Sequence, residues 1–308
     1  MVFKIHVPWS LHLLAGLEND EDCTVNVRDG QLNLELLGES RAIRSVSIAR
    51  NDTAPTIFLA GDSTVCDQDA EPWAGWGQML PSFFQPGIAI ANHAQSGRAL
   101  KSFQWEGRLG AILKEMKAGD YLFVQFTHND QKQGAAHVEP FTTFNDELGV
   151  YIKAARDKGA TPILVTSMHR RFFDADGHIE NTLGDYPESM RQKAKDAGVA
   201  LLDLNAQSRV LYEAWGPEKS KSAFVWFPAH TFPKQEQPLK DNTHFTNYGA
   251  YELARCVVAE ILKSDVDFKR YLRPEAQVFF EAAHPDSPET VAIAPSLSAI
   301  STEKPEGN

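Results

Sequence analysis

The sequence predicts an α/β fold, a three-layer α/β/α sandwich around a mostly parallel five-stranded sheet. Two observations support this prediction. First, five short apolar runs rich in β-forming residues recur along the chain, as is typical of strands buried on both faces of a parallel sheet. Second, stretches with helical spacing separate these runs. Alternating strands and helices place helices on both faces of a sheet through right-handed crossovers.

The strands are expected where the apolar runs occur. These runs are residues 56–60, 88–94, 121–126, 162–167 and 200–204. Apolar residues at helical spacing predict one helix over residues 144–159, ending at Gly159, and another over residues 250–262. Since ligands of a parallel α/β sheet bind outside the carboxyl ends of its strands, polar residues that follow an apolar run are the first candidates for a site.

Composition divides the chain into three regions. Residues 1–54 alternate polar and apolar positions and contain a hairpin turn signal at Asp29-Gly30, which predicts a small β-rich appendage. Residues 55–265 form the predicted α/β domain. Residues 266–308 form a C-terminal extension rich in Pro, Ser and Glu, and its last dozen residues are expected to be disordered.

Charge and composition exclude several classes of function. A net charge of −11 argues against a nucleic-acid partner, which would need a clustered basic face. The three cysteines are widely spaced, so neither a zinc ribbon nor a disulfide framework is indicated. No apolar run approaches the ~20 residues of a membrane span. The N-terminal residues lack the features of a secretory signal, so a cytoplasmic protein is expected. A secreted or periplasmic protein whose signal had been removed would have the same sequence.

The first chemical signal is Gly61-Asp62-Ser63-Thr64, directly after the first apolar run. A glycine permits a tight turn, and the serine then lies at the carboxyl edge of the sheet. Taken alone, the segment also fits an ordinary helix cap, since Asp, Ser and Thr are all good capping residues.

The second signal is Asp241-Asn242-Thr243-His244, just before the predicted helix 250–262. A serine nucleophile needs a base, and histidine is the usual choice because its pKa lies near neutral pH. A carboxylate three residues earlier can hold the other ring nitrogen. Capping of the helix start is again the alternative.

The third signal consists of two loops that follow the second and third runs. They contain Gly97 and Asn129, which could donate a backbone and a side-chain N–H to an oxyanion together with the backbone N–H of Ser63. Each residue alone fits an ordinary turn. All four features occur in this order after a strand or before a helix, and that coincidence favours the catalytic interpretation.

In this order the features resemble the sequence blocks of the SGNH (GDSL-like) hydrolases over about residues 56–265. More narrowly, GDSTV, GWGQ, NHAQSGRALKSFQWEGRL, FTHNDQ and DNTHFTNYGAYELA are similar to rhamnogalacturonan acetylesterases, which deacetylate pectin. The resemblance implies a flavodoxin-like SGNH fold, a triad of Ser63, His244 and Asp241, and an oxyanion hole of Ser63, Gly97 and Asn129. It also implies that the protein uses no metal and no cofactor. The substrate that it implies is an acetylated oligosaccharide or polysaccharide.

Three positions depart from the family pattern. The third block usually begins with glycine, and here that position is Thr127. A β-branched residue rarely adopts a positive φ, so an ordinary β-region backbone is expected there. Ala99 and Trp105 also differ from the serine and acidic residue expected, and these changes could reshape the substrate cleft.

Basic and aromatic side chains in the same loops suggest how a substrate would be held. Arg98, His128 and Trp73 are the candidates, because a guanidinium suits a galacturonate carboxylate and an indole suits a sugar ring. Structural support of the loops is an equally good interpretation of each.

Two other functions stay open at this stage. One is a different acyl hydrolase of the same class, such as a lysophospholipase or thioesterase. The other is a carbohydrate-binding protein that has lost activity. The oligomeric state does not follow from the sequence.

Overall fold

A computed structural model describes residues 53–306, with gaps at 279, 292 and 294–299. The predicted N-terminal appendage, residues 1–54, therefore lies almost wholly outside the described residues. Within the described part of the chain, every helix is too short or too polar to cross a membrane.

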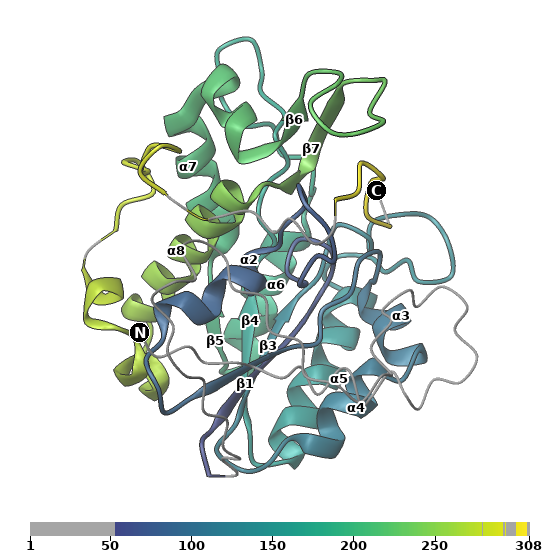
Figure 1. Cartoon of the computed structure of the whole chain (residues 1–308). Helices are drawn as coiled ribbons and strands as arrows, with labels where there is room; N and C mark the ends of the chain where they lie inside the picture. The colour runs from purple at the N-terminus through teal and green to yellow at the C-terminus, as the bar shows by residue number, and fades with distance from the viewer. Residues whose placement is uncertain (1–52, 279, 292, 294–299, 307–308) are drawn as a thin grey trace.

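A parallel sheet of five strands forms the centre of the molecule, in the order β2-β1-β3-β4-β5 (Figure 1). The strands are β1 (Thr56–Gly61), β2 (Ala89–Asn92), β3 (Tyr121–Gln125), β4 (Thr161–Val165) and β5 (Ala200–Leu202). Each lies on one of the predicted apolar runs, and all pair in parallel. The α/β sandwich is confirmed. Because the chain moves to one side of β1 for β2 and to the other side for β3, the sheet has a switch point at β1 and β3, where such folds bind ligands.

Helices cover both faces of the sheet (Figure 1). They are α2 (Trp76–Met79), α3 (Leu100–Trp105), α4 (Arg108–Glu115), α5 (Thr143–Asp157), α6 (Tyr186–Ala197), α7 (Leu204–Lys219) and α8 (Asn247–Lys263). Successive side chains of β3 enter different cores: Phe123 joins the core that holds α2, α7 and α8, while Leu122 and Val124 join the core of α3 to α6. This alternation explains why the strand is apolar throughout.

A two-stranded antiparallel sheet follows α7, made of β6 (Phe224–Phe227) and β7 (Leu239–Phe245). The segment 224–239 therefore begins with strand β6 and leads into β7. Asp241 and His244 lie on β7 and not at the start of a helix; Thr246 is the N-cap of α8. Polar residues such as Asp and Asn have low strand propensity and hide this strand in the sequence. Packing of Phe245 against Phe224, with ring centroids 4.9 Å apart, helps to hold it in place.

The C-terminal extension packs back onto the domain. Phe268, in the short 3₁₀ helix Asp267–Tyr271, is fully buried and contacts Tyr121 and Phe123 of β3. Residues 300–306, expected to be disordered, have a defined position beside the carboxyl edge of the sheet (Figure 1, near the label C).

Candidate active site

The tight turn after β1 fixes Ser63. The backbone N–H groups of Val65 and Cys66 both donate to the Asp62 carbonyl, at 3.0 and 3.1 Å. A Cβ on Gly61 would lie 2.6 Å from Val65 Cγ2, so only glycine fits at the end of the strand. Ser63 is fully buried, and its backbone and neighbours leave it little freedom to move.

His244 joins Ser63 to Asp241. Its Nε2 lies 2.9 Å from Ser63 Oγ, and its Nδ1 lies 2.9 Å from Asp241 Oδ2. The other carboxylate oxygen of Asp241 accepts the backbone N–H groups of Thr243 and His244, at 2.6 and 2.8 Å. The three predicted side chains are therefore brought together in a continuous chain of hydrogen bonds.

The electrostatics of Asp241 suit this arrangement. Burial acts to raise its pKa, but the hydrogen bond to His244 and the electrostatic effect of that ring, together with the two backbone N–H groups, outweigh burial and lower the pKa to about 2. Asp241 is consequently ionised at neutral pH and can stabilise a positive charge that forms on His244.

Trp73 packs edge-on against the imidazole of His244, with ring centroids 5.6 Å apart and planes at 90°. It is only 4% exposed. Its position therefore restrains the histidine ring, and its indole N–H donates to the carbonyl of Ser301 at 2.9 Å.

The loop after β2 runs alongside the Ser63 turn. The N–H groups of His93 and Gln95 donate to the carbonyls of Leu59 and Gly61, both at 3.0 Å, and so continue the strand pairing beyond β2. Gly97 has a φ of 78°, in the left-handed region that favours glycine. The predicted glycine is thus placed two residues beyond a direct contact with the end of β1.

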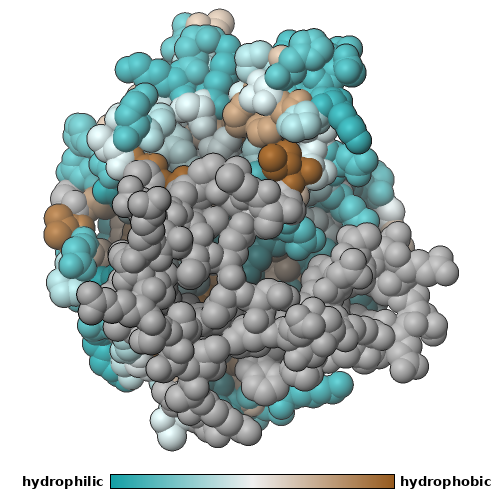
Figure 2. All heavy atoms as spheres, in the orientation of Figure 1, coloured by the Kyte–Doolittle hydropathy of each residue, from teal (hydrophilic) through white to brown (hydrophobic). Residues whose placement is uncertain are grey.

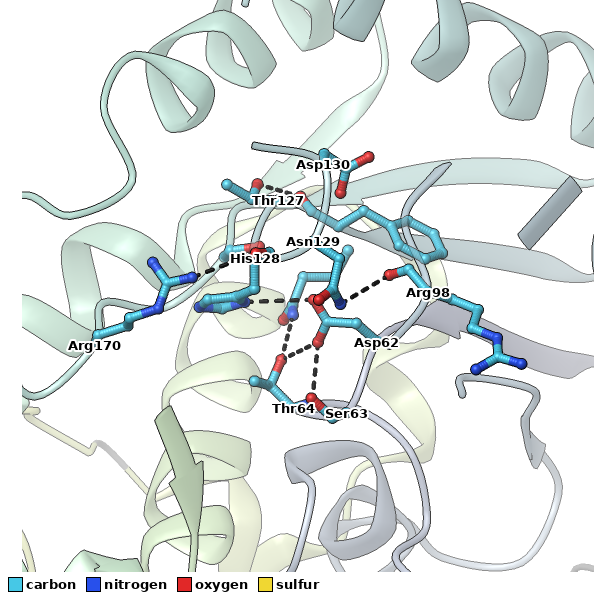
Figure 3. A network of polar contacts seen from close by, with 12 residues as sticks. Asp62, Ser63, Thr64, Arg98, Thr127, His128, Asn129, Asp130 and Arg170 are labelled. Atoms are coloured by element: carbon cyan, nitrogen blue, oxygen red, sulfur yellow. Dashed lines mark hydrogen bonds and ion pairs between the residues drawn. The ribbon is translucent and has the colours of Figure 1, made fainter. Parts of the chain in front are cut away.

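The amide of Asn129, after β3, has a fixed orientation. Its oxygen accepts from Lys132 Nζ at 2.8 Å, and its Nδ2 donates to the carbonyl of Arg98 at 3.1 Å (Figure 3). A carboxamide nitrogen carries two N–H groups, so a second donor remains beyond that hydrogen bond. The contact with Arg98 also ties the third loop to the second.

His128 and Thr127 follow β3, and His128 contacts the turn that carries Ser63. His128 is 1% exposed, and its Nδ1 lies 3.4 Å from Oδ2 of the fully buried Asp62 (Figure 3). Burial lowers the pKa of His128, so the ring is neutral at pH 7. The φ angle of Thr127 is not positive, as expected for a β-branched side chain.

Arg98 follows Gly97 in the loop after β2. It binds the carboxylate of Glu106 through Nε at 2.9 Å, and its Nη1 donates both to the Ser96 carbonyl at 2.9 Å and to the Glu306 carboxylate at 2.6 Å. The guanidinium proposed from the sequence to hold a substrate carboxylate is therefore in contact with a carboxylate of its own chain.

Sequence reasoning missed several residues near the site. Asp62 was noted only as part of a turn, although its Oδ1 accepts both the N–H and the hydroxyl of Thr64, at 2.9 and 2.7 Å. Lys304 and Glu306 gave no signal, because they stand in a polar tail without periodicity. Among the residues that the structure describes, no cluster of His, Cys, Asp and Glu could hold a metal ion.

Known proteins resemble this chain over the α/β domain. Residues 59–250 match the GDSL-like Lipase/Acylhydrolase family. The rhamnogalacturonan acetylesterase RhgT of Bacillus subtilis is 46% identical over 218 residues, which are 70% of this chain and 93% of that protein.

Two further relatives share the same domain. A rhamnogalacturonan acetylesterase of Emericella nidulans is 39% identical, over 63% of this chain and 84% of its own. The crystal structure of YxiM from Bacillus subtilis superposes with a TM-score of 0.60 at 30% identity, covering 70% of this chain and 58% of that one. Because the family match covers more than half of the chain, this chain belongs to the GDSL-like lipase/acylhydrolase family.

Proposed function

We propose that this protein is a serine esterase that removes O-acetyl groups from a carbohydrate, most specifically from pectin or rhamnogalacturonan fragments. The observation that carries the proposal is the pair of 2.9 Å hydrogen bonds joining Ser63, His244 and Asp241 at the switch point of the sheet. A serine with a histidine base and a carboxylate behind it is the arrangement that acyl transfer requires.

In the first step, Ser63 Oγ attacks the ester carbonyl and His244 Nε2 takes its proton. The negative charge on the carbonyl oxygen is stabilised by the N–H groups of Ser63 and Gly97 and by the side-chain N–H of Asn129. His244 then gives its proton to the sugar oxygen as the C–O bond breaks, so that the sugar leaves with a free hydroxyl and the serine keeps the acetyl group.

In the second step, water attacks the acetyl-serine while His244 Nε2 removes its proton. Collapse of this intermediate returns the proton to Ser63 and releases acetate. Asp241 stays ionised throughout and holds the imidazole in the tautomer that the reaction needs. Neither step calls for a metal or a redox cofactor.

The choice of substrate rests on the names of the relatives and on the positive charge of Arg98 beside Gly97. Two relatives are named rhamnogalacturonan acetylesterases. Arg98 presents a guanidinium next to Gly97, where it could hold the carboxylate of a uronic acid, since its planar fork matches a carboxylate well.

The test compares hydrolysis of 4-nitrophenyl acetate and 4-nitrophenyl octanoate by the wild type and by Ser63→Ala. We expect serine-dependent hydrolysis of the acetate only, followed by acetate release from acetylated pectin fragments. Preference for the octanoate would favour a lipid acyl hydrolase of the same family. Fluorophosphonate labelling that persists in Ser63→Ala would remove Ser63 from the mechanism.

A further inference from the structure

The C-terminal segment Ile300–Glu306 contacts several residues of the candidate site and is anchored at its first residues. Ile300 pairs in parallel with Glu71, and the N–H of Ser301 donates to the Glu71 carbonyl at 2.9 Å. The carbonyl of Ser301 accepts the indole N–H of Trp73 at 2.9 Å. The segment thus begins against the tryptophan that packs on His244.

The middle of the segment contacts Asp241, the carboxylate that binds His244. Lys304 Nζ lies 3.4 Å from Asp241 Oδ2, the oxygen that also binds Nδ1 of His244. The Lys304 side chain is about half exposed while Asp241 is almost fully buried. An ammonium group therefore approaches the carboxylate from the solvent side.

The end of the segment reaches the proposed oxyanion loop. Glu306 lies close to Gly97. A Cβ added to Gly97 would lie 3.2 Å from the Cβ of Glu306 and 3.4 Å from the Glu306 carbonyl oxygen. Its carboxylate pairs with Arg98 Nη1 at 2.6 Å. Seven residues therefore connect Trp73, Asp241 and the Gly97-Arg98 loop, which belong to three different parts of the site.

Building on the proposed function, we propose that this segment competes with substrate, and that the Glu306 carboxylate occupies a subsite for a uronate carboxylate. The ligand class of the subsite is an acetylated oligosaccharide that carries a carboxylate beside the acetylated ring. Ser63 and His244 are fully buried, and the segment contacts Trp73, Asp241 and Arg98 beside them. An ester has to reach both residues before acyl transfer.

The contacts of Arg98 explain why it can serve as such a subsite. Glu106 and the carbonyl of Ser96 fix the guanidinium, and its Nη1 is directed at Glu306. A fixed guanidinium binds any carboxylate of suitable reach by charge-assisted hydrogen bonds. A uronate could take the place of Glu306 without any change in the position of Arg98.

The pairing is strong enough to hold the segment and weak enough to be displaced. The side chain of Glu306 is 58% exposed, and ion pairs that exposed are weak and are screened by salt. A substrate with its own carboxylate can therefore exchange with the segment.

The experiment measures hydrolysis of 4-nitrophenyl acetate, a neutral ester, by the full chain, by Glu306→Gln and by a chain that ends at residue 299. We expect the KM to fall by about two- to tenfold on truncation and by less in Glu306→Gln, as suits the loss of an exposed ion pair and a few hydrogen bonds. Raising the salt concentration should lower the KM of the full chain and leave that of Glu306→Gln unchanged. Glu306→Gln also keeps the test valid if the truncated chain folds poorly.

A second measurement addresses the subsite directly. Calorimetry of the truncated chain should detect binding of the peptide ISTEKPE and of an oligogalacturonate without acetyl groups. The two should compete, and Arg98→Ala or replacement of the last Glu of the peptide by Gln should weaken the corresponding binding. A truncated chain that binds neither ligand, or whose KM is unchanged, would overturn the proposal.

Two further outcomes separate the proposed competition by the segment from the proposed esterase function. A truncated chain that folds but loses kcat would mean that the segment is part of the catalytic site and not its competitor, which overturns the inference. If no form of the protein hydrolyses any ester in a Ser63-dependent way, the proposed function fails. The calorimetric result then still decides whether the segment and a uronate share one subsite.

Discussion

At the scale of single residues, the site is organised by groups that leave one another little choice of position. Asp241 uses one oxygen for two backbone N–H groups and the other for His244. The amide of Asn129 is held at both ends, by Lys132 and by the Arg98 carbonyl. Such preorganised groups need little rearrangement during the reaction, which is where enzymes gain much of their rate.

Asp241→Asn should leave the fold intact and lower kcat by about four orders of magnitude. An amide at this position favours the wrong tautomer of His244 and cannot stabilise the imidazolium. Steady-state kinetics on 4-nitrophenyl acetate measures the effect, and near-UV circular dichroism controls for the fold. A kcat within tenfold of the wild type would show that Asp241 does not assist the base.

Asn129→Ala tests the proposed oxyanion hole. Loss of one donor should lower kcat by about 10²–10³ with little change in KM, because the interaction develops only in the transition state. Lys132→Met is the matched control: it removes the contact with the amide oxygen but keeps the donor, so its kcat should fall much less. Equal losses in both variants would point to a structural role for this loop.

At the scale of elements, loops from separate strands and helices are joined by a few buried contacts. Asp130, after β3, is fully buried, and its Oδ1 accepts the first N–H of α3 from Leu100 at 2.8 Å. Gly249, in the first turn of α8, lies against the backbone of Ala223, just before β6. The first contact joins the start of α3 to the loop after β3, and the second joins the start of α8 to the residue before β6.

Asp130 should make stability depend on pH. Burial, and to a lesser degree the charge of Asp62, raises its pKa from 3.8 to about 7. Between these values the folded chain holds a proton that the unfolded chain has released, so this group lowers the free energy of unfolding as the pH rises. Asp130→Asn, which resembles the neutral acid, should match the wild type near pH 4 and exceed it in stability at pH 8. Urea denaturation at the two pH values measures this, and a difference independent of pH would contradict it.

Gly249→Ala should be destabilising by about 2 kcal/mol or more, since a clash with backbone forces α8 away from the hairpin. A Cβ at this position would lie 1.9 Å from the carbonyl oxygen of Ala223. Gly110→Ala, on the exposed side of α4 with no atom within 4 Å of the added Cβ, is the control and should stabilise by about 0.5–1 kcal/mol. The urea midpoints of both variants test the prediction; a Gly249→Ala midpoint at or above that of the wild type would contradict it.

At the scale of the whole molecule, two apolar layers on opposite faces of one sheet support a mostly polar exterior. Outside the grey atoms, the face seen in Figure 2 is largely hydrophilic, with apolar residues in small separate groups. The net charge of −11 is consistent with this polar surface, since charge repulsion between molecules opposes aggregation. Each apolar layer is packed by its own set of helices, and both layers share the central sheet.

Two core substitutions test how the layers cooperate. Leu148→Ala on α5 and Leu253→Ala on α8 empty different layers, and each should lower the free energy of unfolding by about 2–5 kcal/mol. Because the sites share no packing partners, the double variant should show the sum within about 0.5 kcal/mol and a single transition. Chemical denaturation followed by fluorescence and circular dichroism checks both points. Two separate transitions would mean that the layers unfold independently.

Much of this architecture could be predicted from the sequence because its signals are local. Each sheet strand is a short apolar run, and the residues after β1, β2 and β3 had to meet at one edge once those strands were parallel. The strand β7 was not predictable, because the residues proposed to carry the chemistry, Asp241 and His244, weaken its strand pattern. The positions of Lys304 and Glu306 depend on contacts with Trp73, Asp241 and Arg98, which are far away in the sequence and leave no trace in the tail itself.

The hydrogen bond between Ser63 and His244 joins residues that are 181 positions apart. Ser63, the proposed nucleophile, follows the first strand of the sheet, and His244, its proposed base, lies on β7, the last strand before α8. Nearly the whole domain must therefore be in place before the two can meet. Contacts of such long sequence separation form late and slowly, because loop-closure entropy opposes them until the intervening chain is ordered. The onset of esterase activity during refolding would therefore time the completion of the fold, while a partly folded chain that still lacks β7 would carry an inert serine.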